Sequence, residues 1–250
     1  MIVGAVSDIG LKRENNQDYM FASSESDFPI FLVADGMGGH NAGDIASSMA
    51  VKSIVEFIDE NKEMLKNPDD IKRYIKKAID QANDEIFIKS LDSSEFNGMG
   101  TTLTMAYIGD KNLVIGHVGD SRAYLIREGK IIQLTDDHTL VNELIKNGSI
   151  DKDEAKDHPQ GHVITRAIGT SYKIKSDVFS KDITNNDIII LCSDGLTNMI
   201  DDDVILRVIE KYDKKDMNNI CNVLVKLAKE NGGRDNITVI GINMDNEVLR

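Results

Sequence analysis

Two apolar runs of this sequence end in the same dipeptide, Asp-Gly. The run IIILCSDG places Asp194 behind a predicted buried strand, and the run IFLVADG places Asp35 behind another. A single Asp-Gly after a strand is usually only a turn. Because both runs end in the same way, we expect one place in the fold to require carboxylates.

The segment between residues 18 and 35 extends this group of acids. It predicts two strands joined by a polar turn centred between Ser26 and Asp27. In a hairpin with this centre, Asp18 is the partner of Asp35, and both carboxylates lie at the open end of the hairpin. The register therefore predicts two facing acids at one edge of a sheet.

A predicted meander follows, with turns at 109–112 and 127–130. The centre of the first turn pairs Thr101 with Asp120. Further along, Asp235 stands before the predicted strand NITVIGI, and a strand that begins at an acid can lie antiparallel to one that ends at an acid. The acids expected to meet at one sheet edge are Asp18, Asp35, Asp120, Asp194 and Asp235.

Grouped carboxylates repel one another unless protons or cations compensate them. A set of oxygen ligands without His or Cys favours Mg²⁺ or Mn²⁺ over Zn²⁺. Two such ions can activate water and polarise a phosphoryl group, and a nearby arginine is suited to hold phosphate oxygens. Arg13 is the candidate arginine, and the Gly36 carbonyl is a candidate ligand.

The histidines have other expected roles. His40, in the segment DGMGGHNAGD, is a candidate general acid, a donor to the ligands or an exposed loop residue. His117 lies within a predicted strand and is expected to be a hydrogen-bonded core residue. Arg166 could support the site or a neighbouring loop. Surface positions are expected for His138, His158 and His162.

Composition narrows the function classes. The 250 residues, 41% of them hydrophobic, suffice for a large core. A net charge of −13 argues against a nucleic-acid partner, which requires a basic surface. No apolar run is long enough to insert into a membrane and no signal peptide is expected, so we predict a cytoplasmic protein. Cys192 and Cys221 are expected to be buried free thiols.

The helical segments come in pairs. Periodic apolar residues predict helices over 42–60 and from Pro68 onward, and again over 201–212 and 216–230. The polar segment 139–162 is bounded by sheet patterns and is predicted to be an inserted surface subdomain. Antiparallel strands with separate helix pairs predict an α+β layered domain.

The motifs occur in one order that spans essentially the whole chain. Together they resemble the metal-dependent type 2C protein serine/threonine phosphatases, the PPM family, and in particular the compact bacterial members. Any one motif would be a weak signal, but seven in order are highly specific. The motifs are SDIGLKRENNQD, FLVADGMGGHNAGD, GMGTTLT, GHVGDSRAYLIREGKIIQLTDDHTLV, HVITRAIGT, IIILCSDGLTNMI and GGRDNITVIGI.

The resemblance implies a fold and a ligand set. It implies an α-β-β-α sandwich, in which two antiparallel sheets lie between helix pairs, as one catalytic domain over 1–250. Residues 139–162 correspond to the flap beside the active site. Two core ions, Mn²⁺ or Mg²⁺, are implied, with Asp35 bridging them and a possible third ion at Asp120. The implied ligands are Asp18, Asp35, Gly36, Asp120, Asp194 and Asp235.

The resemblance also implies roles around these ions. Arg13 resembles the phosphate-binding arginine, and Asn236 matches the partner of the last acid. Many eukaryotic members have His directly after the second Asp-Gly, where this sequence has Met37. The general acid therefore stays open between His40, three residues later, and a metal-bound water.

The implied activity is hydrolysis of phosphoserine and phosphothreonine on proteins. A metal-bridging hydroxide attacks in line without a phosphoenzyme, opposing a bacterial serine/threonine kinase, and we expect a monomer. Three alternatives stay open. They are a pseudophosphatase that binds phosphoproteins without turnover, a hydrolase of small phosphate esters or nucleotides, and a regulatory phosphatase of a partner-switching pathway, which normally has additional sensor domains.

Overall fold

The computed structural model describes residues 1–23, 29–39, 42–109, 111–156 and 158–245. Within these residues, all strand pairs are antiparallel. The strands are β1 (Ile2–Asp8), β2 (Asp18–Ala22), β3 (Ile30–Met37), β4 (Gly100–Thr101), β5 (Leu103–Ile108), β6 (Asn112–Val118), β7 (Arg122–Arg127), β8 (Lys130–Gln133), β9 (Asp177–Asp182), β10 (Ile188–Cys192) and β11 (Ile237–Asn243).

The described strands form two sheets. One has the order β1-β11-β10-β7-β8, and the other has the order β2-β3-β5-β6-β9 with β4 paired to β3. The predicted hairpin register is confirmed, because Asp18 is the partner of Asp35. The predicted turn itself, at Ser26 and Asp27, lies outside the described residues.

The predicted register between the first two strands of the meander is confirmed, but the predicted pair at the end away from the turn is not. Leu103 pairs with Val118 in the predicted offset, and Arg127 pairs with Lys130 across the second turn. The expected pair of Thr101 and Asp120 is wrong. Thr101 instead belongs to β4, where it pairs with Gly36 and forms a bridge to Ile168. Thr101 does not continue the β5–β6 ladder because its backbone groups pair with Gly36 and Ile168 instead.

The long helices form where the apolar periodicity predicts them. Asn67 caps α2 through hydrogen bonds from the backbone N–H groups of Asp69 and Asp70, and Pro68 occupies the first turn, where its missing N–H is not required. The helices are α1 (Ala42–Glu60), α2 (Pro68–Ser90), α3 (Leu140–Lys146), α4 (Lys152–Lys156), α5 (Asp194–Thr197), α6 (Asp202–Lys211) and α7 (Met217–Glu230), with short 3₁₀ helices at Lys62–Met64 and Ser94–Phe96.

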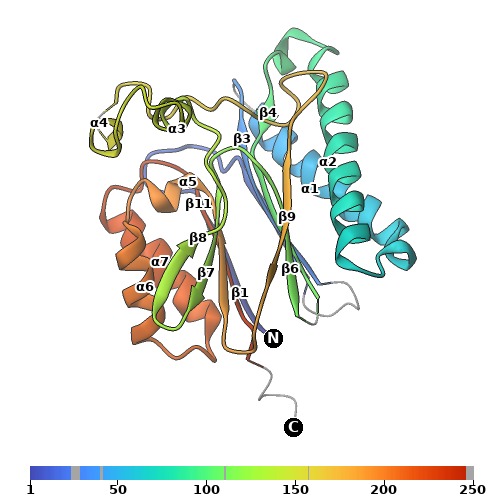
Figure 1. Cartoon of the computed structure of the whole chain (residues 1–250). Helices are drawn as coiled ribbons and strands as arrows, with labels where there is room; N and C mark the ends of the chain where they lie inside the picture. Colours follow the sequence, from blue (N-terminus) through green and yellow to red (C-terminus); the bar gives the residue numbers. More distant parts are fainter. Residues whose placement is uncertain (24–28, 40–41, 110, 157, 246–250) are drawn as a thin grey trace.

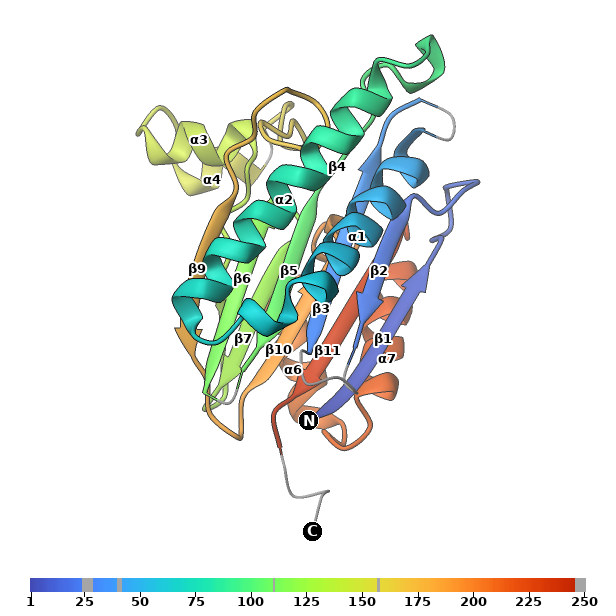
Figure 2. The same cartoon turned by 90° about the vertical axis from the view of Figure 1, so that its right-hand side faces the viewer.

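Two views show the layers of helices and sheets (Figures 1 and 2), and three clusters of buried apolar side chains lie between them. Strand β3 illustrates the arrangement. Phe31 and Val33 face the other sheet, whereas Leu32 and Ala34 face the side covered by α1 and α2. Because both faces of β3 are covered, its sequence is a continuous apolar run rather than an alternating one. Helices α6 and α7 cover the outer face of the other sheet, which confirms the predicted α-β-β-α sandwich.

The short helices α3 and α4 lie within the predicted flap, residues 139–162, between β8 and β9. In Figure 1 they lie at the end of the sandwich where α5 begins, and the N-terminus lies at the opposite end. Among the described residues, no helix combines the length and apolar composition needed to span a bilayer.

Candidate active site

The predicted acids come together at the end of the sandwich near α5. Strand β2 begins at Asp18 and β3 carries Asp35 near its end, while Asp120 follows β6. Asp194 follows β10, and Asp235 precedes β11. Strands of both sheets therefore deliver one acid each to the same edge, where the carboxylates are close enough to shift one another's pKa.

Asp18 is buried, and its carboxylate is held from the other sheet. Ser193 Oγ donates a hydrogen bond of 2.7 Å to Asp18 Oδ2, and the same Oγ accepts the Thr238 backbone N–H at 3.0 Å. The second oxygen, Oδ1, is buried without a hydrogen-bond partner. One oxygen of Asp18 is thus fixed by the protein, and the other is available to a cation.

Asp35 and Gly36 are fixed through their backbone. The Asp35 N–H donates to Thr102 Oγ1 at 3.0 Å, and the Asp35 carbonyl accepts from the Thr102 N–H at 2.9 Å and from Thr101 Oγ1 at 2.9 Å. The Gly36 N–H donates to the Gln17 carbonyl at 3.1 Å. These bonds occupy the backbone of Asp35 and leave its carboxylate to interact with the neighbouring acids.

Asp194 begins α5, and its Oδ2 accepts a 2.9 Å hydrogen bond from Asn198 Nδ2, while Oδ1 is buried without a partner. Asp235 differs, because Arg13 Nη2 donates to its Oδ2 at 2.7 Å. Arg13 therefore lies beside the acids, where it is paired with Asp235, a predicted metal ligand.

Asn236 joins the loop before β2 to the start of β11. Its Oδ1 accepts the Gln17 backbone N–H at 2.9 Å, and its Nδ2 donates to the carbonyls of Ile9 and Asn15 at 3.0 Å each. The residue is 4% exposed. Asn236 thus orders the segment that carries Arg13 against the strand that follows Asp235.

Repulsion and burial raise the pKa values of the acids. Burial first, and then the charges of Asp194 and Asp235, raise the pKa of Asp18 to about 7. Burial and Asp194 raise the pKa of Asp120 to about 7. Burial and the facing Asp18 hold the pKa of Asp35 well above its usual value. The folded protein therefore opposes full ionisation of this edge unless cations compensate it.

The donor set fits a hard divalent cation. Three acids, Asp18, Asp120 and Asp194, each present a buried carboxylate oxygen without a hydrogen-bond partner, and buried polar atoms in proteins normally have one. Oxygen ligands of this kind suit Mg²⁺ or Mn²⁺. Among the described residues, however, no three acids, histidines or cysteines close around one point as metal ligands do. The acids share an edge, and Asp235 is turned toward Arg13.

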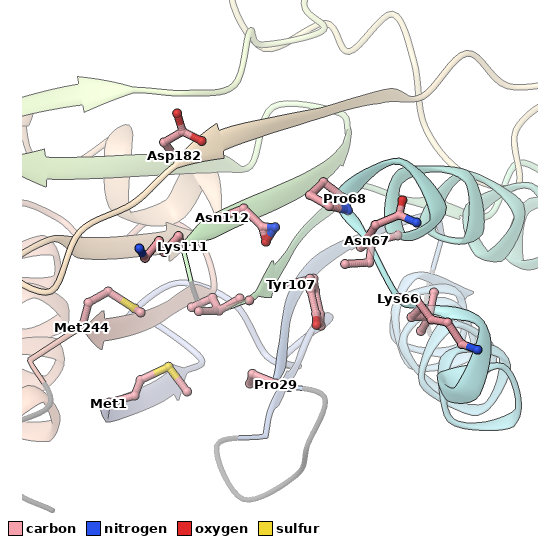
Figure 3. A pocket seen from close by; sticks show the side chains of 14 residues that line it. Met1, Pro29, Lys66, Asn67, Pro68, Tyr107, Lys111, Asn112, Asp182 and Met244 are labelled. Atoms are coloured by element: carbon pink, nitrogen blue, oxygen red, sulfur yellow. The ribbon is translucent and has the colours of Figure 1, made fainter.

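A groove of about 1220 Å³ runs from this edge to the flap. Arg13, Asp120, Asp194 and Asp235 line one part of it, and side chains of the segment 141–162 line the other. A second hollow, of about 940 Å³, lies near Met1 and Met244 and contains one carboxylate, Asp182, among its described lining residues (Figure 3). Of these two hollows, the groove is the one whose described lining combines an arginine with several carboxylates.

The histidine predictions have mixed outcomes. His117 is a hydrogen-bonded core residue as predicted, with Thr104 Oγ1 at 2.9 Å from Nδ1 and the Asp136 carbonyl at 3.1 Å from Nε2. His138 is not at the surface. It is only 3% exposed, and its ring contacts Gly119, Asp177 and the ring of His117. His40 lies outside the described residues.

Sequence reasoning missed the groups that support the acids. Ser193 precedes Asp194 in the sequence but binds Asp18, which is 175 residues away in the chain. Thr102 Oγ1 accepts the Asp35 N–H and lies 2.8 Å from the hydroxyl group of Ser121, the residue after Asp120. Ser121 beside Asp120 and Ser193 beside Asp194 were the available signal, but the partners of these hydroxyl groups depend on tertiary packing.

Comparison with known proteins agrees with this geometry. The sequence matches the family model of protein phosphatase 2C over residues 7–237. The serine/threonine phosphatase stp of Listeria monocytogenes is 38% identical over 241 residues, which cover 96% of this chain and 94% of that protein.

Solved structures show the same similarity. The fold resembles the serine/threonine phosphatase PstP/Ppp of Mycobacterium tuberculosis with a TM-score of 0.88 and 32% identity, covering 97% of this chain and 98% of that one. It also resembles a catalytic domain of PstP in complex with two manganese ions, with a TM-score of 0.82, 31% identity and 96% of each chain covered. The chain therefore belongs to the protein phosphatase 2C family and is a protein serine/threonine phosphatase.

Proposed function

We propose that this phosphatase removes phosphate from phosphoserine and phosphothreonine with divalent cations held at the acidic edge. The observation that carries this proposal is the set of three buried carboxylate oxygens without partners, on Asp18, Asp120 and Asp194, next to Arg13. A hydrogen-bonded structural cluster would leave no such oxygens. Manganese in the PstP complex supports Mn²⁺ as one suitable ion.

The carboxylates have distinct proposed positions around two core ions. Asp18, Asp35 and the Gly36 carbonyl would hold the first ion, and Asp35, Asp194 and Asp235 would hold the second. A third ion would use Asp120 with Asp194. When bound, such ions supply a water of lowered pKa as nucleophile and polarise the phosphoryl group.

Arg13 is the group of the chain that would bind the phosphate. Its side chain is 49% exposed in the groove, while Asp235 holds the guanidinium at 2.7 Å. An arginine fixed by one carboxylate can present its remaining N–H groups to phosphate oxygens. We assign Arg13 to orienting the phosphate in line with the attacking oxygen and to stabilising its charge. Protonation of the leaving oxygen would come from His40 or from water.

The cysteines do not provide an alternative nucleophile. Cys192 and Cys221 are both buried, and burial raises the pKa of each thiol to about 12. A thiolate nucleophile requires the opposite shift and an accessible position. These properties support attack by water rather than a covalent phosphocysteine.

The groove connects the acidic edge with the flap. We infer that the whole chain acts as one catalytic domain and that its flap, residues 139–162, borders the bound phosphoprotein. We further infer a monomeric cytoplasmic enzyme that opposes a serine/threonine kinase. The rival activities differ in substrate. A hydrolase of small phosphate esters would favour those over phosphoproteins, and a pseudophosphatase would bind phosphopeptide without release. A partner-switching phosphatase would prefer one phosphorylated regulator.

The central experiment measures phosphate release from a phosphothreonine peptide with Mn²⁺ and with EDTA. We compare the wild type with Asp194→Asn and with Asp203→Asn, an exposed acid in the first turn of α6. Both substitutions remove one negative charge, but only Asp194 has a partnerless oxygen at the edge. We expect chelation and Asp194→Asn to abolish release, and Asp203→Asn to leave it unchanged. Release that survives both chelation and Asp194→Asn would reject the mechanism.

A further inference from the structure

His138 is the last residue before the flap, and its backbone and ring both bind Gly119, the residue before Asp120. The His138 N–H donates to the Gly119 carbonyl at 2.8 Å, and the Gly119 N–H donates to His138 Nδ1 at 3.0 Å. One residue therefore satisfies both backbone groups of Gly119. This reciprocal pair fixes the chain immediately before an acid of the site.

Gly119 requires such support because its backbone is unusual. Its φ of +108° is accessible mainly to glycine, and a Cβ at this position would lie 2.6 Å from the Thr102 side chain. On the other side of Asp120, the Ser121 carbonyl accepts from Thr104 Oγ1 at 2.9 Å. Asp120 is thus held between two anchored neighbours, and its Oδ1 is buried without a partner.

The ring of His138 is oriented from its other nitrogen. Because Nδ1 accepts the Gly119 N–H, Nε2 carries the proton of the neutral ring and donates to Asp177 Oδ2 at 3.1 Å. Arg166 Nη1 lies 3.1 Å from Nε2 and 3.4 Å from the other oxygen of Asp177. The ring also packs against the ring of His117, with centroids 4.8 Å apart and planes tilted by 40°. The surrounding residues therefore fix both the position of the His138 ring and its tautomer.

The same residue closes the base of the flap. The Thr165 N–H donates to the His138 carbonyl at 2.7 Å, the Leu140 N–H donates to the Val163 carbonyl at 2.9 Å, and Thr139 forms an antiparallel bridge with Ile164. The chain thus enters and leaves the flap as a hydrogen-bonded pair of segments that His138 joins to Gly119.

We propose that His138 is a positioning residue that fixes the backbone at Asp120 and joins it to the base of the flap. The role of Asp120 as a ligand of the third ion rests on the function proposed above. Displacement of Gly119 would move Asp120 and the flap together, so binding of that ion and the position of the flap would be coupled through one side chain.

Two amide variants separate the contact of the ring to Gly119 from its contact to Asp177. In His138→Asn, the amide oxygen can take the place of Nδ1 and accept the Gly119 N–H, but the contact to Asp177 is lost. In His138→Gln, the longer amide can reach Asp177, but the acceptor for Gly119 is lost. A matched control is Asn243→Ala, which removes another buried side chain with hydrogen bonds to backbone groups, at the far end of β11.

The first measurement is hydrogen exchange of the Gly119 amide in EDTA, where no ion contributes. We expect exchange at least about fivefold faster in His138→Gln than in the wild type, because a buried donor has lost its acceptor. We expect His138→Asn to stay close to the wild type. Unchanged exchange in His138→Gln, or equal acceleration in both amide variants and Asn243→Ala, would overturn the proposal.

The second measurement is calorimetric titration with Mn²⁺ without substrate, together with Asp120→Asn. We expect His138→Gln to lower the affinity of the site that Asp120→Asn removes, and His138→Asn to preserve it. If Asp120→Asn binds Mn²⁺ like the wild type while Gly119 exchange still rises in His138→Gln, the positioning role stands and the ligand role of Asp120 fails. Normal Mn²⁺ binding in His138→Gln, where Asp120→Asn loses a site, would contradict the coupling.

Discussion

Arg13 Nη2 lies 2.7 Å from Asp235 Oδ2, across 222 residues of sequence. The pair joins the loop before β2 to the residue before β11, so a candidate phosphate ligand and a candidate metal ligand share one ion pair. The hydrogen bond to Asp235 and the charges of Asp235, Asp35 and Asp194 raise the pKa of Arg13 despite the opposing effect of burial, which keeps the guanidinium charged. A substrate phosphate that binds the Arg13 guanidinium would therefore also affect the Asp235 carboxylate paired with it.

Arg13→Ala should weaken phosphopeptide hydrolysis. A hydrogen bond to a charged group contributes about 1.5–3 kcal/mol, which corresponds to a loss of about 10- to 100-fold in kcat/KM. Lys12→Ala is the matched control, because it removes an exposed positive charge from the adjacent residue. Steady-state kinetics at saturating Mn²⁺ provide the measurement. An equal loss of kcat/KM in the two variants would show that Arg13 contributes only its positive charge and does not bind the phosphate directly.

Ser193→Ala should destabilise the protein and disturb Asp18. The substitution removes the donor to Asp18 Oδ2 and leaves the Thr238 N–H buried without an acceptor, which costs about 1–3 kcal/mol. We expect a lower free energy of unfolding in urea and weaker Mn²⁺ binding. Ser53→Ala is the control, since Ser53 is also buried but its Oγ has no hydrogen-bond partner. A similar destabilisation in both variants would contradict the role of the Ser193 hydrogen bonds.

Asp120→Asn should change how stability depends on pH when metals are chelated. Burial and Asp194 raise the pKa of Asp120 to about 7, whereas the pKa of an unfolded-chain Asp is about 3.9. The folded protein therefore binds this proton more tightly. The resulting stabilisation is complete below about pH 4 and is lost as the pH rises through about 7.

The measurement compares urea unfolding of wild type and Asp120→Asn in EDTA from about pH 5 to pH 8, so that groups that do not interact with Asp120 cancel. We expect the variant to gain stability relative to the wild type as pH rises, by at least about 1.4 kcal/mol, the value of one pKa unit. Asp203→Asn, which removes an exposed acid away from this edge, is the control. A difference for Asp120→Asn that is flat or falls with pH would reject the raised pKa.

Gly195→Ala should displace the start of α5. A Cβ at this position would lie 1.9 Å from the Asn236 carbonyl oxygen, which is too close for any real contact. Overpacking of this kind costs about 1–3 kcal/mol, and the shift should also lower Mn²⁺ affinity through Asp194. Gly39→Ala is the control, because its Cβ would meet nothing within 4 Å. Thermal unfolding and Mn²⁺ titration check both effects, and unchanged values for Gly195→Ala would contradict the close approach.

The strand pattern and register predicted much of the acidic edge. Asp18 opposite Asp35 follows from the turn position alone, because side chains in an antiparallel ladder alternate with a fixed period. Glycine is required at position 195 because the Asn236 carbonyl approaches it closely, and not only because the chain turns there. This approach depends on tertiary packing, so the local sequence pattern does not predict it. Thr101 likewise left its predicted partner for Gly36 and Ile168, since backbone groups pair with whichever strand packs beside them.

The sequence by itself determined the layered fold, the helix pairs and the acids that share an edge, because apolar periodicity and strand register are local properties of the chain. Only the tertiary structure decided that Ser193 holds Asp18, that Arg13 pairs with Asp235 and that His138 is buried against Gly119. The first two contacts join residues more than 170 positions apart, and the third joins two loops across the sheet edge. Hydrogen bonds of this kind form where packing brings donor and acceptor together, and spacing along the chain does not encode that meeting.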